Sequence, residues 1–138
     1  MVPGPFVDET GKKVGEHKGL ANYTIGQRDK LGLALGYPVY VYKIDRVANT
    51  VHVGDMAKLY CAGLVAAQAN WVSMEIPEET VEVTARIRYN SPEVKAYLTA
   101  MDEANVRLEF AEPQKSVTPG QSVVFYDKDV VLGGAIIH

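Results

Sequence analysis

The feature that most constrains the fold of this chain is the alternation of short apolar runs with turn-forming residues. Across 138 residues, runs rich in Val, Ile and Tyr are interrupted by Gly, Pro, Asn or Asp. The interruptions come about every ten residues, which is typical of an all-β sandwich or barrel. The pattern therefore predicts an all-β fold built from short antiparallel strands.

The first third of the chain is expected to form two β-hairpins. One turn is expected at residues 9–12 and a second at 47–49, where Asn49 tolerates the positive φ of a tight hairpin. The strands expected around these turns are residues 4–8 with 13–15, and 39–45 with 50–54. Further strands are expected at residues 64–73, 80–89, 106–110, 122–127 and 130–137.

Two segments also match helical patterns. Residues 56–61 are consistent with a short helical turn, and Ser91, Pro92 and Glu93 supply an N-cap, a first-turn proline and a first-turn carboxylate. Against a helix at 93–100, apolar and polar residues alternate there, and the period-two run 106–110 needs an antiparallel partner. We therefore expect a strand at 93–100 and a turn at 102–105.

Composition restricts the classes of protein that the chain can represent. Hydrophobic residues make up 47% and charged residues 22%, as in a globular domain, and no apolar run approaches the roughly 20 residues of a membrane helix. The single cysteine, Cys61, excludes an intrachain disulfide and fits a reducing cytoplasm. Cys61 is expected near a core edge. No signal peptide is evident, and the abrupt Pro/Gly-rich start resembles a cut inside a longer protein.

Charge is segregated along the chain, whose formal net charge is -3. Residues 12–30 hold five cationic and two anionic side chains, whereas residues 75–112 hold nine acidic and four basic ones. This shift predicts a small β unit at residues 1–62 followed by a β-barrel at 63–138. A local basic face is compatible with nucleic-acid binding even in an acidic chain.

Sequence motifs for common catalytic and metal sites are missing. The chain contains no phosphate-binding P-loop, Rossmann glycine motif, HExxH or CxxC, and nothing marks a catalytic nucleophile. His17, His52 and His138 are too isolated to indicate a metal site. His17 instead suits a hydrogen-bonding or phosphate-facing position in the basic loop. No catalytic or metal-binding residue is therefore assigned.

Three further stretches have both a structural and a functional interpretation. Arg86 and Arg88 would share one strand face with Tyr89 opposite, and could either solvate a strand edge or contact phosphates and a base. Pro119 and Gly120 fit a type II turn that presents Gln121. Paired glycines at 133–134 indicate a bulge or a close backbone approach. Asp127 and Asp129 flank a hairpin turn and are expected to be solvated.

Taken in order, these signals resemble one family. The residues that carry the resemblance are Phe6-Val7-Asp8, Gly11, Gly15, His17, Gly19, the hexapeptide 23–28 (YTIGQR), Leu31-Gly32-Leu33, Tyr40-Val41, Asn49, Val51, Val53-Gly54, Trp71, Arg88-Tyr89, Pro113-Gln114, Thr118-Pro119-Gly120-Gln121, Val124-Phe125-Tyr126 and Leu132-Gly133-Gly134. They span almost the whole chain and resemble the central and C-terminal parts of the tRNA-specific 2-thiouridylase family, also called tRNA (5-methylaminomethyl-2-thiouridylate)-methyltransferases.

The resemblance implies a fold and a function. It implies a small β-hairpin domain followed by a translation-factor-like antiparallel β-barrel, in an enzyme that uses ATP and magnesium to place sulfur on C2 of a wobble uridine. The family's ATP-pyrophosphatase domain, with its SGGxDS-type loop and two cysteines, has no counterpart here, and Cys61 matches neither cysteine. The resemblance therefore implies a tRNA-binding fragment that is inactive alone and has no cofactor of its own.

The resemblance also implies partners and contact residues. The partners would be tRNA, the missing N-terminal domain and a sulfur-relay donor protein, with no membrane involved. Arg88, Tyr89 and Gln121 would contact tRNA, and His17, Gln27 and Arg28 would contact tRNA or the missing domain. In the hexapeptide 23–28, Gly26 would form a turn while Tyr23 and Ile25 anchor it.

Several residues depart from the family pattern. Lys30 and Ala135 stand where the family usually has glycine, Val39 where tryptophan is common and Asn90 where arginine is common. These departures leave the set of recognised tRNAs open. The alternative to an RNA-binding fragment is a translation-factor-like barrel that serves as a non-enzymatic protein-interaction module.

Overall fold

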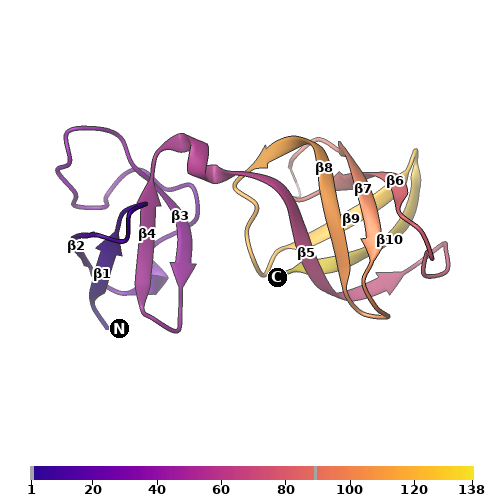
Figure 1. The fold of residues 1–138 in the computed structure, drawn as a ribbon, viewed down its shortest axis with the longest axis horizontal. Coiled ribbons are helices and arrows are strands. Elements are labelled where there is room, and N and C mark those ends of the chain that lie inside the picture. The colour runs from indigo at the N-terminus through magenta and orange to yellow at the C-terminus, as the bar shows by residue number, and fades with distance from the viewer. Residues whose placement is uncertain (1, 89) are drawn as a thin grey trace. The chain divides into compact units, whose positions relative to one another are not determined.

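The computed structural model describes residues 2–88 and 90–138, and the fold is all-β, as the sequence predicts. The chain forms two compact units, Met1–Tyr60 and Cys61–His138, and the regular structure of each is mainly strands (Figure 1). Residue 62, after which a boundary is expected, lies within strand β5 (Tyr60–Trp71).

The first unit is a mixed β-sheet. Within its described residues, four strands lie in the order β2-β1-β4-β3, where β1 is Gly4–Val7, β2 is Lys13–His17, β3 is Tyr40–Asp45 and β4 is Thr50–Gly54. The β1–β2 and β3–β4 pairs are antiparallel hairpins, as expected. A parallel pairing of β1 with β4, which places Phe6 opposite Val51, joins the hairpins into one sheet. Local sequence patterns did not predict this pairing.

Both hairpin turns of the first unit are held by an aspartate. Asp8 Oδ1 accepts the N–H groups of Thr10 (2.9 Å) and Lys12 (3.0 Å), and Asp45 Oδ1 accepts those of Val47 and Ala48 (3.0 Å each). Asn49 has φ +54°, which confirms the expected positive φ. The short 3₁₀ helices are η1 (Leu20–Asn22) and η2 (Met56–Leu59), and the second confirms the helical turn expected there.

The second unit is a closed antiparallel barrel. Within residues 61–88 and 90–138, six strands close in the order β10-β5-β8-β7-β6-β9 (Figure 1). The remaining strands are β6 (Val81–Arg86), β7 (Val94–Ala100), β8 (Val106–Lys115), β9 (Ser122–Asp127) and β10 (Val130–Ile137). The strand expected at 93–100 is therefore confirmed. Alternating residues such as Ala96, Leu98, Leu108 and Phe125 point inward and form the core.

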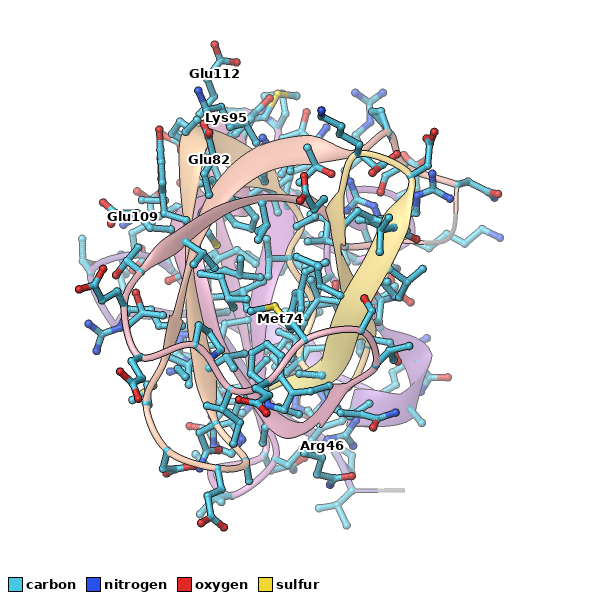
Figure 2. All side chains as sticks on the ribbon, turned by 90° about the vertical axis from the view of Figure 1, so that its right-hand side faces the viewer. Arg46, Met74, Glu82, Lys95, Glu109 and Glu112 are labelled. Carbon is cyan, nitrogen blue, oxygen red and sulfur yellow. The ribbon has the colours of Figure 1, made fainter. Side chains whose placement is uncertain are left out.

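A long segment crosses each end of the barrel. Strands β5 and β6 stand three places apart whichever way the ring is followed, and so do β8 and β9. Residues 72–80 must therefore cross one end and residues 116–121 the other. Figure 2 looks onto the loop that carries the half-buried Met74. At the other end, Val117 packs against the barrel core.

Glycine allows the closest strand approaches in the barrel. A Cβ atom at Gly133 would lie 2.4 Å from the carbonyl oxygen of Asn70, and one at Gly63 would lie 2.4 Å from that of Leu108. The register of β10 also shifts on both sides of the paired glycines. The bulge and the close backbone approach predicted at 133–134 are both confirmed.

Candidate RNA-binding surfaces

The hexapeptide 23–28 covers the free edge of β3. Gly26 N–H donates to the carbonyl of Val41 at 2.7 Å, and Val41 N–H donates to the carbonyl of Gln27 at 2.9 Å. Gly26 has φ +93°, a conformation that favours glycine and turns the chain back along the strand. The hexapeptide therefore satisfies backbone groups that an edge strand would otherwise expose.

The side chains of the hexapeptide are divided between the core and the loop. Tyr23 and Ile25 pack against the core of the first unit, which confirms that they anchor the segment. The Gln27 amide is used locally, because its Oε1 accepts Thr24 N–H (3.0 Å) and its Nε2 donates to the Asp29 carbonyl (2.8 Å). Gln27 thus stabilises the loop, whereas Arg28 is exposed beside Asp29.

His17 is part of the core of the first unit. Its side chain is 1% exposed, and its ring meets those of Phe6 and Tyr23 edge to face at centroid distances of 5.9 and 5.8 Å. Nδ1 accepts Gly19 N–H (3.0 Å), so Nε2 carries the proton and donates to the Asn49 carbonyl (2.7 Å). Both ring nitrogens are engaged, which matches the hydrogen-bonding interpretation. A phosphate contact would require the ring to leave the core.

A basic cleft lies beside the hexapeptide. It has a volume of about 430 Å³, and its lining includes Lys18, Lys30, Tyr23 and Gln27, with Glu16 as the acidic member. Lys30 has φ +60°, so lysine occupies here the left-handed conformation that the family's usual glycine adopts without strain. Two lysines against one glutamate leave the lining with a net positive charge, which favours an anionic ligand.

In the barrel, Arg88 clamps the loop that crosses its end. Nη1 donates to the carbonyls of Lys115 (2.8 Å) and Ser116 (3.0 Å). Both bonds use one nitrogen, and a guanidinium has five N–H donors in all. Arg88 can therefore hold the loop and contact a phosphate with the same side chain.

The prediction that Arg88 lies within a strand is wrong. Strand β6 ends at Arg86, because Ser91 draws the Arg88 backbone into a turn. Ser91 Oγ accepts Arg88 N–H (3.1 Å) and donates to the Arg88 carbonyl (2.8 Å). The sequence signal was available, since a serine followed by proline favours a turn as well as a helix cap. Tyr89, the neighbouring candidate, lies outside the described residues.

Gln121 is presented by the turn that the sequence predicts. Gln121 N–H donates to the Thr118 carbonyl (3.3 Å), and Gly120 has φ +89°, as a type II turn requires. Thr118 Oγ1 donates to the same Ser116 carbonyl that Arg88 binds. A chain of hydrogen bonds thus connects Arg88 to the turn, and the Gln121 residue is exposed.

Charge differs sharply between the two barrel ends. The Arg88 end, defined as residues 86–93 and 115–121, holds three cations and one carboxylate. The acidic end, defined as residues 72–80, 101–105 and 127–131, holds seven carboxylates and one lysine. On the barrel wall, Glu82 and Lys95 lie side by side in Figure 2, with Nζ 2.7 Å from Oε1. Topology therefore places three of the six cationic side chains of residues 61–138 at an end that holds one carboxylate.

Residues 2–88 and 90–138 contain no group of three or more His, Cys, Asp and Glu side chains placed to hold a metal ion. None of their helices has the length and apolar character needed to cross a membrane. Cys61 is half-buried, and burial raises the pKa of its thiol, which disfavours the nucleophilic thiolate.

Comparison with known proteins matches both units. Residues 1–55 match the family described as tRNA methyl transferase PRC-barrel domain, and residues 61–137 match the Aminomethyltransferase beta-barrel domain. The chain is 52% identical over 135 residues to the tRNA-specific 2-thiouridylase MnmA of Halothermothrix orenii, covering 98% of this chain and 38% of that protein.

Two other relatives carry the same name. The protein from Acetivibrio thermocellus is 48% identical over 136 residues, covering 99% of this chain and 38% of its own length. The protein from Chlorobaculum tepidum is 46% identical over 134 residues, which cover 97% of this chain and 37% of that protein. The chain thus spans little more than a third of the length of these relatives. It belongs to the tRNA-specific 2-thiouridylase family.

Proposed function

We propose that this chain is the tRNA-binding portion of a tRNA 2-thiouridylase that acts in the cytoplasm. Under this proposal, the parts of the relatives that the chain does not match bind ATP and magnesium, accept sulfur from a donor protein and modify C2 of the wobble uridine. The two β units position the RNA for that reaction. Phosphate contacts can fix the register of an RNA while a separate active site selects the base.

The observation that carries the proposal is the charge asymmetry of the barrel. RNA is a polyanion, so affinity depends mainly on cations that replace counterions along its backbone. The Arg88 end offers Arg86, Arg88 and Lys115, while its carboxylate, Glu93, lies 3.8 Å from Arg86 Nη2 and accepts a hydrogen bond from Thr84. The acidic end would repel the same ligand. RNA should therefore approach the barrel from the Arg88 end.

Within this end, Arg88 and Gln121 have different proposed functions. Arg88 would bind a phosphate while it holds the crossing loop through the carbonyls of Lys115 and Ser116. Gln121, exposed on the loop's turn, would hydrogen-bond a phosphate, a ribose hydroxyl or a base edge. Tyr89 retains its proposed stacking contact on the strength of the sequence resemblance alone.

The basic cleft of the first unit supplies a second proposed contact surface. Lys18 and Lys30 line it, and the exposed Arg28 follows the hexapeptide. Because Gln27 and His17 are engaged in local hydrogen bonds, we assign them to holding the loop and not to contacting RNA. The proposed RNA contacts of this unit are therefore the three cations.

The test is equilibrium binding of unmodified tRNA to the 138-residue chain over a range of salt concentrations. Replacing Arg88 by Ala removes one phosphate contact, so the slope of log K against log salt should fall by about 0.9. Gln121→Ala should weaken binding without changing that slope. The matched control is Arg107→Ala, which removes an exposed arginine next to the acidic end and should leave both quantities unchanged.

Two results would contradict the proposal. Equal losses from Arg88→Ala and Arg107→Ala would mean that net charge, not the Arg88 end, governs binding. If Arg88→Ala and Arg107→Ala both bound tRNA with wild-type affinity and unfolded at the wild-type temperature, the proposed contact between Arg88 and a phosphate would be wrong. The chain itself is expected to show no ATP turnover, which an assay for pyrophosphate release checks.

A further inference from the structure

The acidic end of the barrel also carries an exposed apolar patch. Between residues 61 and 138, the described part of the barrel has seven exposed large hydrophobic side chains, and five belong to this end. The five are Val72, Ile76, Met101, Val130 and Val131. Single exposed apolar residues are normal, but a group of them at one end of a small domain indicates an interaction surface.

Backbone hydrogen bonds bring the centre of this patch together. Val72 N–H donates to the Leu132 carbonyl at 2.9 Å, and the Ser73 hydroxyl donates to the carbonyl of Val131. Val72 is 63% exposed, Val130 53% and Val131 39%. The backbone at Val72 therefore lies beside that at Val131 and Leu132, although almost 60 positions separate them in the sequence.

Local structure holds the neighbouring loops in place. The 101–105 turn is attached to β5, because Ala69 N–H donates to the Ala104 carbonyl at 2.9 Å. Within the turn, Asp102 Oδ1 accepts the N–H groups of Ala104 and Asn105 at 2.8 Å each. Met101 and Asp102 are thereby presented on an ordered turn, which lowers the entropy cost of binding.

The charge around the patch restricts what can cover it. The patch shares its end of the barrel with seven carboxylates and one lysine. This charge opposes RNA and anionic lipid, and it complements a cationic surface. Protein contacts commonly combine an apolar centre with a polar rim, and this end of the barrel carries both kinds of side chain.

We propose that the acidic end docks a second protein, whose contact surface presents apolar side chains ringed by Lys and Arg. The docking surface is centred on Val72, Val130 and Val131 and lies at the opposite end of the barrel from the proposed RNA contacts. This protein docking goes beyond the proposed RNA binding and does not depend on it. A barrel with both surfaces can hold RNA at one end and a protein at the other.

The test uses the full 138-residue chain and three short synthetic peptides, with binding measured by titration and mapped by amide NMR shifts. The first peptide is an amphipathic helix of Leu and Lys, the second replaces Lys by Glu, and the third replaces Leu by Ser. The Leu/Lys peptide should bind at least tenfold more tightly than either control. Its shifts should fall in residues 72–80, 101–105 and 127–132.

Variants separate the patch from general charge attraction. Val72→Ser combined with Val130→Ser should weaken Leu/Lys binding at least tenfold, whereas Val65→Ser, at an exposed valine on the barrel wall, should not. Equal binding of the Leu/Lys and Ser/Lys peptides, or shifts at the Arg88 end, would overturn the proposal. Dimerisation that the double valine variant abolishes would overturn it too, because the occupant would be a second copy. These outcomes are independent of tRNA affinity.

Discussion

Gly133 provides a quantitative test of how the barrel closes. A Cβ atom there would lie 2.4 Å from the Asn70 carbonyl oxygen and 3.3 Å from the Trp71 Cα. Ordinary contact begins near 3.4 Å, so Gly133→Ala must separate β10 from β5 by about 1 Å. The atoms on both sides belong to paired backbone, so no flexible side chain can move aside.

The expected cost follows from this geometry. Overpacking costs about 1–3 kcal/mol, and a clash between two backbones should lie at the upper end of that range, at about 3 kcal/mol. For a domain of about 60–100 residues, each kcal/mol lowers Tm by about 4–8 °C. Gly133→Ala should therefore lower the Tm of the barrel by about 12–24 °C.

The assay is thermal unfolding followed by the fluorescence of Trp71, the one tryptophan of the chain. Trp71 pairs with Gly133 and lies 5.8 Å from the Phe125 ring, so it reports on the affected strands. Gly134→Ala should cost less, since its nearest atom is 3.1 Å away. A Cβ atom at Gly120 would have no neighbour within 4 Å, so Gly120→Ala measures only the backbone strain at φ +89°. A Gly133→Ala barrel that melts within about 2 °C of the wild type would refute the reasoning, since even about 1 kcal/mol should lower Tm further.

Three further predictions concern local interactions. His17→Ala should destabilise the first unit by about 3–5 kcal/mol, because it leaves a cavity and removes two hydrogen bonds. Urea unfolding followed by NMR measures this, and a loss of stability below about 1 kcal/mol would contradict it. Lys30→Gly should stabilise that unit by about 1 kcal/mol in the same urea experiment by relieving φ +60°, and a loss of stability would contradict this. Hydrogen bonds within their turns lower the folded-state pKa of Asp8, Asp45 and Asp102. The stabilising effect of these carboxylates is therefore full above pH 3.8 and is lost as pH falls through the lower folded pKa values, which carboxyl titration by NMR checks.

Local chemistry was enough to predict the strands and most turns. Residues 50–54, 122–127 and 130–137 form strands with the expected bounds. Asn49 and Gly120 adopt the positive φ that their turn positions demand. In each case the information lies within a few residues, where alternation and turn preferences act directly.

Non-local contacts explain what the sequence patterns missed. The parallel β1–β4 pairing and the burial of His17 both depend on residues about 30 or more positions away, in β4 and at Asn49. The end of β6 depends on one side chain, because Ser91 competes with the strand ladder for the Arg88 backbone. This competition is local, and hydrophobic periodicity does not reveal it, although the Ser-Pro pair favours a turn.

In the candidate site too, local signals were predictable and longer-range contacts were not. The sequence pointed to Arg88 and Gln121, but not to the carbonyls of Lys115 and Ser116, which connect Arg88 to the turn before Gln121. The acidic stretch was evident as composition, yet only the barrel topology separates Arg86 and Arg88 from most of those carboxylates. Charge in the sequence therefore predicted a basic stretch at residues 12–30 and an acidic barrel, but not the cationic end of that barrel.

The most direct test of the central claim is a map of which barrel end an RNA covers. Hydroxyl-radical footprinting of the 138-residue chain, with and without unmodified tRNA, measures this residue by residue. We predict protection at residues 86–93 and 115–121, and none at 72–80, 101–105 and 127–131. Protection of the acidic end, or equal protection of both ends, would contradict the account.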